Sequence, residues 1–145
     1  MSAANGVQDT KENKEEVEFP QTWEALVEQN PILAGLPKPM PAESFSFDVA
    51  ARFEETRTRM YVAFNASTRN EDDEHAAAMV HERVEALRGM IAWVKTVTDD
   101  EAKVDEFTQG MDVNTLFLTL LVVVKFVEDQ LGKSVQSKSS STSIR

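Results

Sequence analysis

Apolar residues recur every three or four positions along most of the chain between residues 19 and 131, the spacing that gathers side chains on one face of an α-helix. This periodicity predicts helices at 22–29, 46–64, 71–96, 99–107 and 113–131. Residues suited to capping a helix stand at the expected starts: Thr22, Asn70, Thr98 or Asp99, and Asp112. Gly110 and Gly132 follow the last two helices, where glycine commonly marks a helix end.

Two of the predicted helices carry clear apolar stripes. In the helix at 46–64, spacings of four or seven join Phe45, Val49, Phe53, Met60 and Phe64. In the helix at 71–96, the stripe consists of Met79, Val80, Val84, Leu87, Ile91 and Val94, with Met90 and Trp93 beside it. Gly89 interrupts this helix at a cost of about 1 kcal/mol relative to alanine, so we expect it to pack closely against a neighbouring element.

Four prolines lie between the first two helices, within residues 31–41. Each proline fixes φ and lacks an N–H group, so the segment is predicted to run extended with polyproline character. Ile32, Leu33 and Leu36 give it apolar side chains to bury. We therefore expect this segment to wrap around the core.

The segment 113–131 is the most apolar part of the chain. From Leu116 to Val124 the only polar residue is Thr119, and three consecutive valines would also fit a buried strand. We favour a helix, because no second strand of similar quality is available to pair with it. A helix that is apolar nearly all round is buried on most sides. Either it lies at the centre of the bundle, or part of it is left for a binding partner.

Together these elements predict an all-α fold, a small helical bundle of about four to five helices in a single domain at 19–131. Residues 1–18 are acidic and nearly free of large apolar groups, so they are predicted to be disordered. Residues 132–145 are rich in serine and are predicted to form a flexible tail.

The chain has no cysteine and a net charge of -10, which is unevenly spread: -3 in 1–18, -10 in 19–131 and +3 in 132–145. An acidic body repels phosphate backbones, so binding to nucleic acid is not expected. The longest apolar run has nine residues, whereas a bilayer crossing needs about 20. The N-terminal stretch also lacks the apolar core of a secretory signal. Neither a membrane span nor a secretory leader is expected.

Signals for catalysis or metal binding are weak. His75 and His81 lie six positions apart, on different sides of a helix, whereas paired helical metal ligands prefer a spacing of three or four. Gly132-Lys133-Ser134 resembles the end of a phosphate-binding loop but lacks the glycine five residues earlier. We therefore expect no catalytic residue, no metal site and no cofactor, and interpret the chain as a protein-binding protein and not an enzyme.

The protein-binding hypothesis has candidate residues in two places. On the helix at 113–131, the contact surface for a partner or a second copy is expected to be formed by, or to lie beside, Leu116, Phe117, Leu120, Val124 and Val127. In the first helix, Trp23 and Leu26 beside a proline segment have the pattern of a docking motif. The alternative, that these two residues pack in their own core, is favoured by the usual burial of such side chains.

The C-terminal part of the chain also has features found together in a known family. They are Asp105-Glu106-Phe107, then Gly110-Met111-Asp112-Val113, then a long apolar helix closing with Phe126-Val-Glu-Asp-Gln-Leu-Gly-Lys-Ser and a serine-rich tail. In this order they resemble tail assembly chaperones of long-tailed (siphovirus-type) bacteriophages, most closely those of phages with actinobacterial hosts. The resemblance covers roughly residues 45–140 and is one of pattern and order, without an invariant motif.

The resemblance implies a small, acidic, helical protein that acts in the host cell cytoplasm and is absent from the mature virion. Such a chaperone binds the tape measure protein, keeps it soluble and helps the tail tube protein polymerise around it. Two other functions stay open on the residues alone: an acidic helical inhibitor that mimics nucleic acid, and a structural subunit of a phage particle. Arginines interrupt the acidic residues along the helices, which argues against the mimic.

Overall fold

The computed structural model describes residues 19–66 and 73–143, and every regular element within these ranges is helical. The α-helices are α2 (Trp23–Gln29), α3 (Phe47–Asn65), α4 (Asp73–Val97), α5 (Glu101–Thr108) and α6 (Val113–Ser143). Two short 3₁₀ helices, η1 (Pro31–Gly35) and η2 (Ala42–Ser44), lie between α2 and α3. The predicted all-α fold is confirmed. The predictions for 1–18 and for the Asn70 cap lie outside the described residues.

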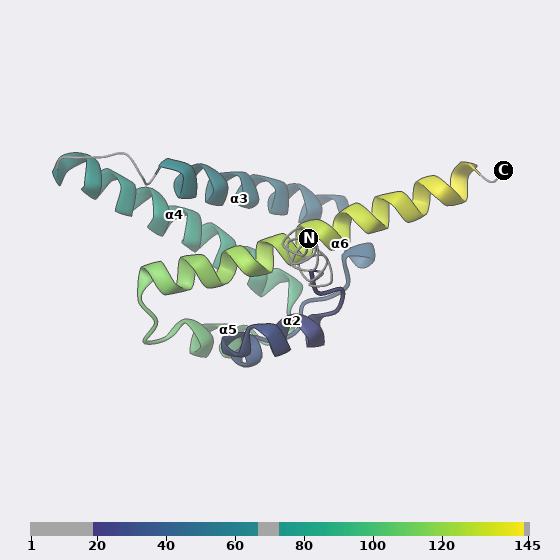
Figure 1. Ribbon diagram of the computed structural model, residues 1–145, viewed down its shortest axis with the longest axis horizontal. Coiled ribbons are helices and arrows are strands. Elements are labelled where there is room, and N and C mark those ends of the chain that lie inside the picture. Colours follow the sequence, from purple (N-terminus) through teal and green to yellow (C-terminus); the bar gives the residue numbers. More distant parts are fainter. Residues whose placement is uncertain (1–18, 67–72, 144–145) are drawn as a thin grey trace, which may run out of the picture.

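The helices form two layers with α6 between them. Figure 1 shows α3 and α4 side by side as an antiparallel pair, with α2 and α5 on the opposite side of the bundle. α6 passes between these layers, and its C-terminal end extends beyond the other helices. All five helices and η1 contribute to one buried apolar cluster. A helix covered on two sides needs apolar residues over most of its circumference, which accounts for the composition of α6.

Side-chain caps define the starts of four helices. In each, a side-chain oxygen accepts a hydrogen bond from the backbone N–H three residues later, at 3.0–3.1 Å: Thr22, Ser46, Asp100 and Asp112. These bonds satisfy N–H groups that have no acceptor within the helix. The predicted caps Thr22 and Asp112 are confirmed, whereas α5 is capped by Asp100 and not by Thr98 or Asp99.

Gly89 lies where α3 and α4 approach each other closely. A Cβ atom on Gly89 would lie 3.4 Å from Cγ2 of Thr56 on α3, so the expected close packing of this glycine is confirmed. The same side of α4 is the buried one, made by Ala86, Leu87, Met90, Trp93, Val94 and Val97. Of the predicted stripe, Leu87 and Val94 are buried, as are Met90 and Trp93 beside it, so its C-terminal part is confirmed. Val80, in its N-terminal part, is 56% exposed.

The proline segment is only partly extended. It forms η1 and η2 with an extended stretch between them, because the fixed φ of Pro31 suits the first position of a helical turn. Its expected contact with the core is confirmed for Leu33 and Leu36, which are buried, but Ile32 is 46% exposed. The backbone N–H of Met40 donates a hydrogen bond to the carbonyl of Val97 at 2.8 Å, which ties the segment to the end of α4.

α6 is a helix, as favoured over a strand, but its predicted end at Leu131 is wrong. The backbone stays helical through Gly132 to Ser143, within the segment predicted to form a flexible tail. A glycine inside a helix costs only about 1 kcal/mol, and no proline follows to stop α6. Gly110, by contrast, has a φ of +78° just after α5, the left-handed conformation in which glycine ends a helix. No helix of the described residues, α6 included, is long and apolar enough to cross a membrane.

Candidate protein-binding surface

The seven residues predicted to contact a partner all lie in the interior of the bundle. None is more than 7% exposed: Trp23, Leu26, Leu116, Phe117, Leu120, Val124 and Val127. They belong to the same cluster as the buried residues of α3, α4 and α5. The prediction that the five α6 residues form an exposed contact surface is therefore corrected, because layers on both sides of α6 cover them. Trp23 and Leu26 on α2 pack in the core, the alternative that the sequence favoured, although Trp23 also lines a groove where α2 meets α6. Protein binding itself stays a prediction.

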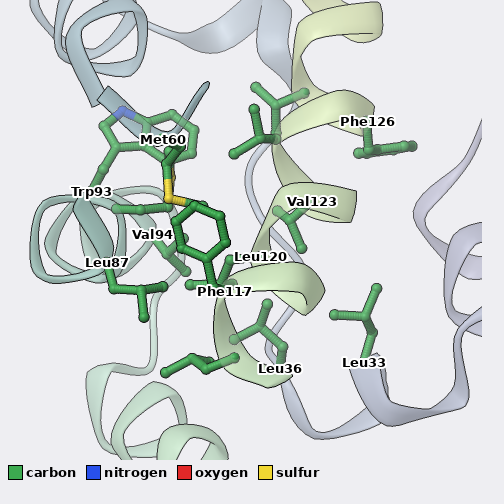
Figure 2. Packing of buried hydrophobic residues seen from close by; sticks show 14 of the residues in the cluster. Leu33, Leu36, Met60, Leu87, Trp93, Val94, Phe117, Leu120, Val123 and Phe126 are labelled. Atoms are coloured by element: carbon green, nitrogen blue, oxygen red, sulfur yellow. The ribbon is translucent and has the colours of Figure 1, made fainter. Parts of the chain in front are cut away.

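Two of these residues, Phe117 and Trp23, make aromatic contacts that join helices within the core. The ring of Phe117 stacks with Phe64 at a centroid distance of 6.5 Å, and the guanidinium carbon of Arg83 lies 5.0 Å from the centre of the same ring. Trp23 meets Phe126 edge to face at 5.8 Å, which joins α2 to α6. Figure 2 shows α6 with side chains of α4 on one side and those around η1 on the other.

An apolar groove nevertheless stays open beside the outward face of α6. Leu118 on α6 is 45% exposed and Ile32 on η1 is 46% exposed. Between them runs the Ile32–Leu118 groove, with a volume of about 220 Å³, lined by Asn30, Ile32, Leu33, Leu118, Thr119 and Val122. Two nearly half-exposed aliphatic side chains that flank a groove form a contact point for an apolar partner side chain.

Sequence reasoning missed this groove for two reasons. Leu118 and Val122 are four positions apart and share a face of α6, but in a helix apolar nearly all round this pair does not stand out. Ile32 was expected to be buried with Leu33 and Leu36. The 3₁₀ turn of η1 instead directs Leu33 inward and leaves Ile32 exposed. Only the position of η1 relative to α6 brings these residues together.

A polar network joins α3 to α6 at the edge of the core. The carboxylate of Glu128 accepts hydrogen bonds from the Tyr61 phenol at 3.1 Å and from Nη1 of Arg57 at 3.0 Å. Burial, followed by the charge and hydrogen bond of Glu128, raises the pKa of Tyr61. The hydrogen bond with Glu54 raises the pKa of Arg57. Because these groups are engaged with one another, the network positions two helices and does not have the features of an acid–base site.

The two histidines considered as ligands both lie on α4 and are exposed. Within residues 19–66 and 73–143, no group of three or more His, Cys, Asp or Glu side chains is arranged to hold a metal ion.

Comparison of the chain with protein-family models, with curated proteins and with solved structures finds no match.

Proposed function

We propose that this chain is a tail assembly chaperone of a long-tailed bacteriophage. In this proposal it binds the tape measure protein in the host cell cytoplasm, promotes assembly of the tail tube protein around it, and is absent from the mature virion. The observation that carries the proposal is the Ile32–Leu118 groove, an apolar groove left open beside the most apolar helix of the bundle. The order of features in the C-terminal part, which resembles this family, supplies the choice of client.

The physical properties of the chain suit a client that is long, helical and amphipathic. The groove offers apolar area to the apolar stripe of such a helix, which is how helix-in-groove recognition works. Residues 19–131 carry a charge of -10, and this surplus keeps a complex with a poorly soluble client dispersed. Val135, in the C-terminal part of α6, is 65% exposed and adds a further apolar contact for a client.

The test is co-expression with the tape measure protein encoded in the same genome. We expect the tape measure protein to be insoluble alone, and soluble and co-purifying with this chain when both are expressed. A client that remains insoluble, or that is soluble without this chain, would contradict the proposal. Mass spectrometry of purified virions separates the alternatives: a structural subunit would be present in the particle, whereas a chaperone would be missing.

The groove itself is tested with a matched pair of variants. Ile32→Asp with Leu118→Asp places two charges in the groove, and we expect this double variant to lose about tenfold or more in client affinity. Val62→Asp with Val80→Asp is the control, because it adds the same two charges at similarly exposed positions that lie outside the lining of the groove. Circular dichroism confirms that both variants fold. Equal loss of client binding in the two variants would show that the groove is not the contact site.

A further inference from the structure

A second groove lies on a different part of the bundle, where α2, the proline segment and α6 meet. It has a volume of about 290 Å³. Trp23 and Phe126, each 7% exposed, line its interior, and the more exposed Met40 also borders it between Pro39 and Pro41. We call it the Trp23–Phe126 groove. Its volume lies just below the range of about 300–1,000 Å³ that is usual for ligand pockets.

The walls of this groove are held in place by contacts from three elements. The side-chain amide of Gln130 on α6 donates a hydrogen bond to the carbonyl of Gln21 at 3.1 Å, which fixes the start of α2 against α6. Met40 is held by its backbone hydrogen bond to Val97. Lys38 pairs with Glu24 across the rim at 3.0 Å. A groove with walls fixed in this way is formed before a partner arrives, so little ordering is needed on binding.

The proline segment keeps this wall apolar without leaving unpaired backbone donors. Pro39 and Pro41 have no N–H groups, and both border the groove. The Met40 N–H between them already has an acceptor. A flexible methionine flanked by two rigid prolines can adjust to the shape of an inserted side chain while the backbone stays fixed.

The charges around the groove are mainly acidic. Its two charged lining residues, Glu24 and Lys38, pair with each other. Beyond that pair, Glu43 directly follows the lining residue Ala42, and Glu28 lies one helical turn after Glu24 on α2. Both carboxylates are exposed, and neither belongs to an ion pair among the described residues. A partner with basic residues beside its apolar anchor is therefore complementary.

We propose that the Trp23–Phe126 groove binds an amphipathic helix of another protein, which inserts an aromatic or large aliphatic anchor and places lysine or arginine against Glu28 and Glu43. Edge and face contacts with Trp23 and Phe126 suit such an anchor. This inference does not rest on the chaperone assignment, because it names a separate site by the chemistry of its lining and is tested without a phage client.

The test uses the full chain with isotope-labelled methionine methyl groups and tryptophan indoles, and a synthetic amphipathic peptide of about 18 residues built from Leu, Phe and Lys. A matched peptide carries Glu in place of Lys. The Lys peptide is expected to shift the Met40 methyl and Trp23 indole signals, while the methyls of Met60 and Met90, both 0% exposed, stay in place. The Glu peptide is expected to bind about tenfold more weakly or not at all.

Two pairs of variants separate this site from general attraction to an acidic protein. Met40→Asp is expected to lower affinity for the Lys peptide about tenfold, whereas Val80→Asp, equal in charge, leaves it unchanged. Glu43→Lys is expected to weaken binding about threefold, whereas Glu82→Lys on α4 has a smaller effect. If the members of either pair weaken binding equally, or if Met40 does not respond, the proposal is overturned. Met40 shifts that depend on protein concentration without peptide would assign the groove to a second copy and also overturn it.

Discussion

The phenol of Tyr61 on α3 donates a hydrogen bond to Oε1 of Glu128 on α6 at 3.1 Å, a contact between residues 67 positions apart in the chain. Arg57 reaches the other oxygen of the same carboxylate at 3.0 Å. The three side chains therefore fasten the outer helix α3 to the central helix α6 beside the core. Because Tyr61 is the only tyrosine in the chain, its ionisation can be followed without interference.

Tyr61 is expected to titrate above its ordinary pKa of 10.0, because burial and Glu128 both disfavour the phenolate. A group whose pKa is raised by folding stabilises the fold fully below its unfolded pKa and loses that contribution as the pH rises through the folded value. Stability should therefore fall in the alkaline range above pH 10. Phenolate absorbance measures the titration directly. Glu128→Gln should bring the pKa of Tyr61 down, and Tyr61→Phe should reduce the alkaline loss by the part that Tyr61 contributes. An ordinary pKa of Tyr61 in the folded chain would contradict the network.

Neighbouring positions on α6 are expected to respond very differently to truncation. Phe117 is 0% exposed, so Phe117→Ala should lower the free energy of unfolding by about 3–5 kcal/mol through lost burial and a residual cavity. Leu118 is 45% exposed, so Leu118→Ala should cost about 1 kcal/mol or less. Urea denaturation of the two variants measures the contrast. Similar losses at both positions would mean that α6 is rotated relative to the orientation described.

Gly89 offers a test of how closely α3 and α4 pack. Gly89→Ala removes a helix penalty of about 1 kcal/mol and places Cβ at 3.4 Å from Thr56, a distance at which a small adjustment suffices. We therefore expect unchanged or slightly raised stability. Gly89→Leu should instead separate the helices and cost about 1–3 kcal/mol. Thermal unfolding of the two variants measures this difference in stability. Equal stability of the leucine and alanine variants would show that α3 and α4 do not pack closely at Gly89.

Gly132 tests the continuation of α6 beyond the bundle. A Cβ atom there meets nothing within 4 Å, so Gly132→Ala should only raise helix propensity, by about 1 kcal/mol. Gly132→Pro should interrupt the helix and cost about 3 kcal/mol in local helix stability. Far-ultraviolet circular dichroism should show more helix for the alanine variant and less for the proline variant. Identical spectra for all three chains would show that the helix stops before this residue.

The parts of the fold that sequence reasoning predicted are those governed by local chemistry. Helix caps depend on side chains that are close in sequence, and the predicted caps Thr22 and Asp112 are confirmed. The prediction that 113–131 is helical is also confirmed. The close packing of Gly89 was also inferred correctly. These features depend on hydrogen bonds and contacts that periodicity and glycine positions reveal directly.

The parts that were wrong depend on tertiary arrangement. Periodicity cannot tell which side of an all-apolar helix faces the core, so Phe117 and Val124 were assigned to a contact surface although both are buried. In α4 the periodicity correctly placed Leu87 and Val94 in the core, but it could not show that the core ends before Val80. The end of α6 was placed at Leu131 because a glycine after a helix may either end it or lie inside it, and only the backbone conformation distinguishes the two.

The course of α6 has a mechanical consequence. Its first half is clamped between two layers, while residues 132–143 extend outward for about 18 Å at the usual rise per residue. One continuous helix thus has a first half held by both layers and a second half that projects from them. Sideways force on the projecting half would be transmitted as torque to the side chains that fill the middle of the molecule.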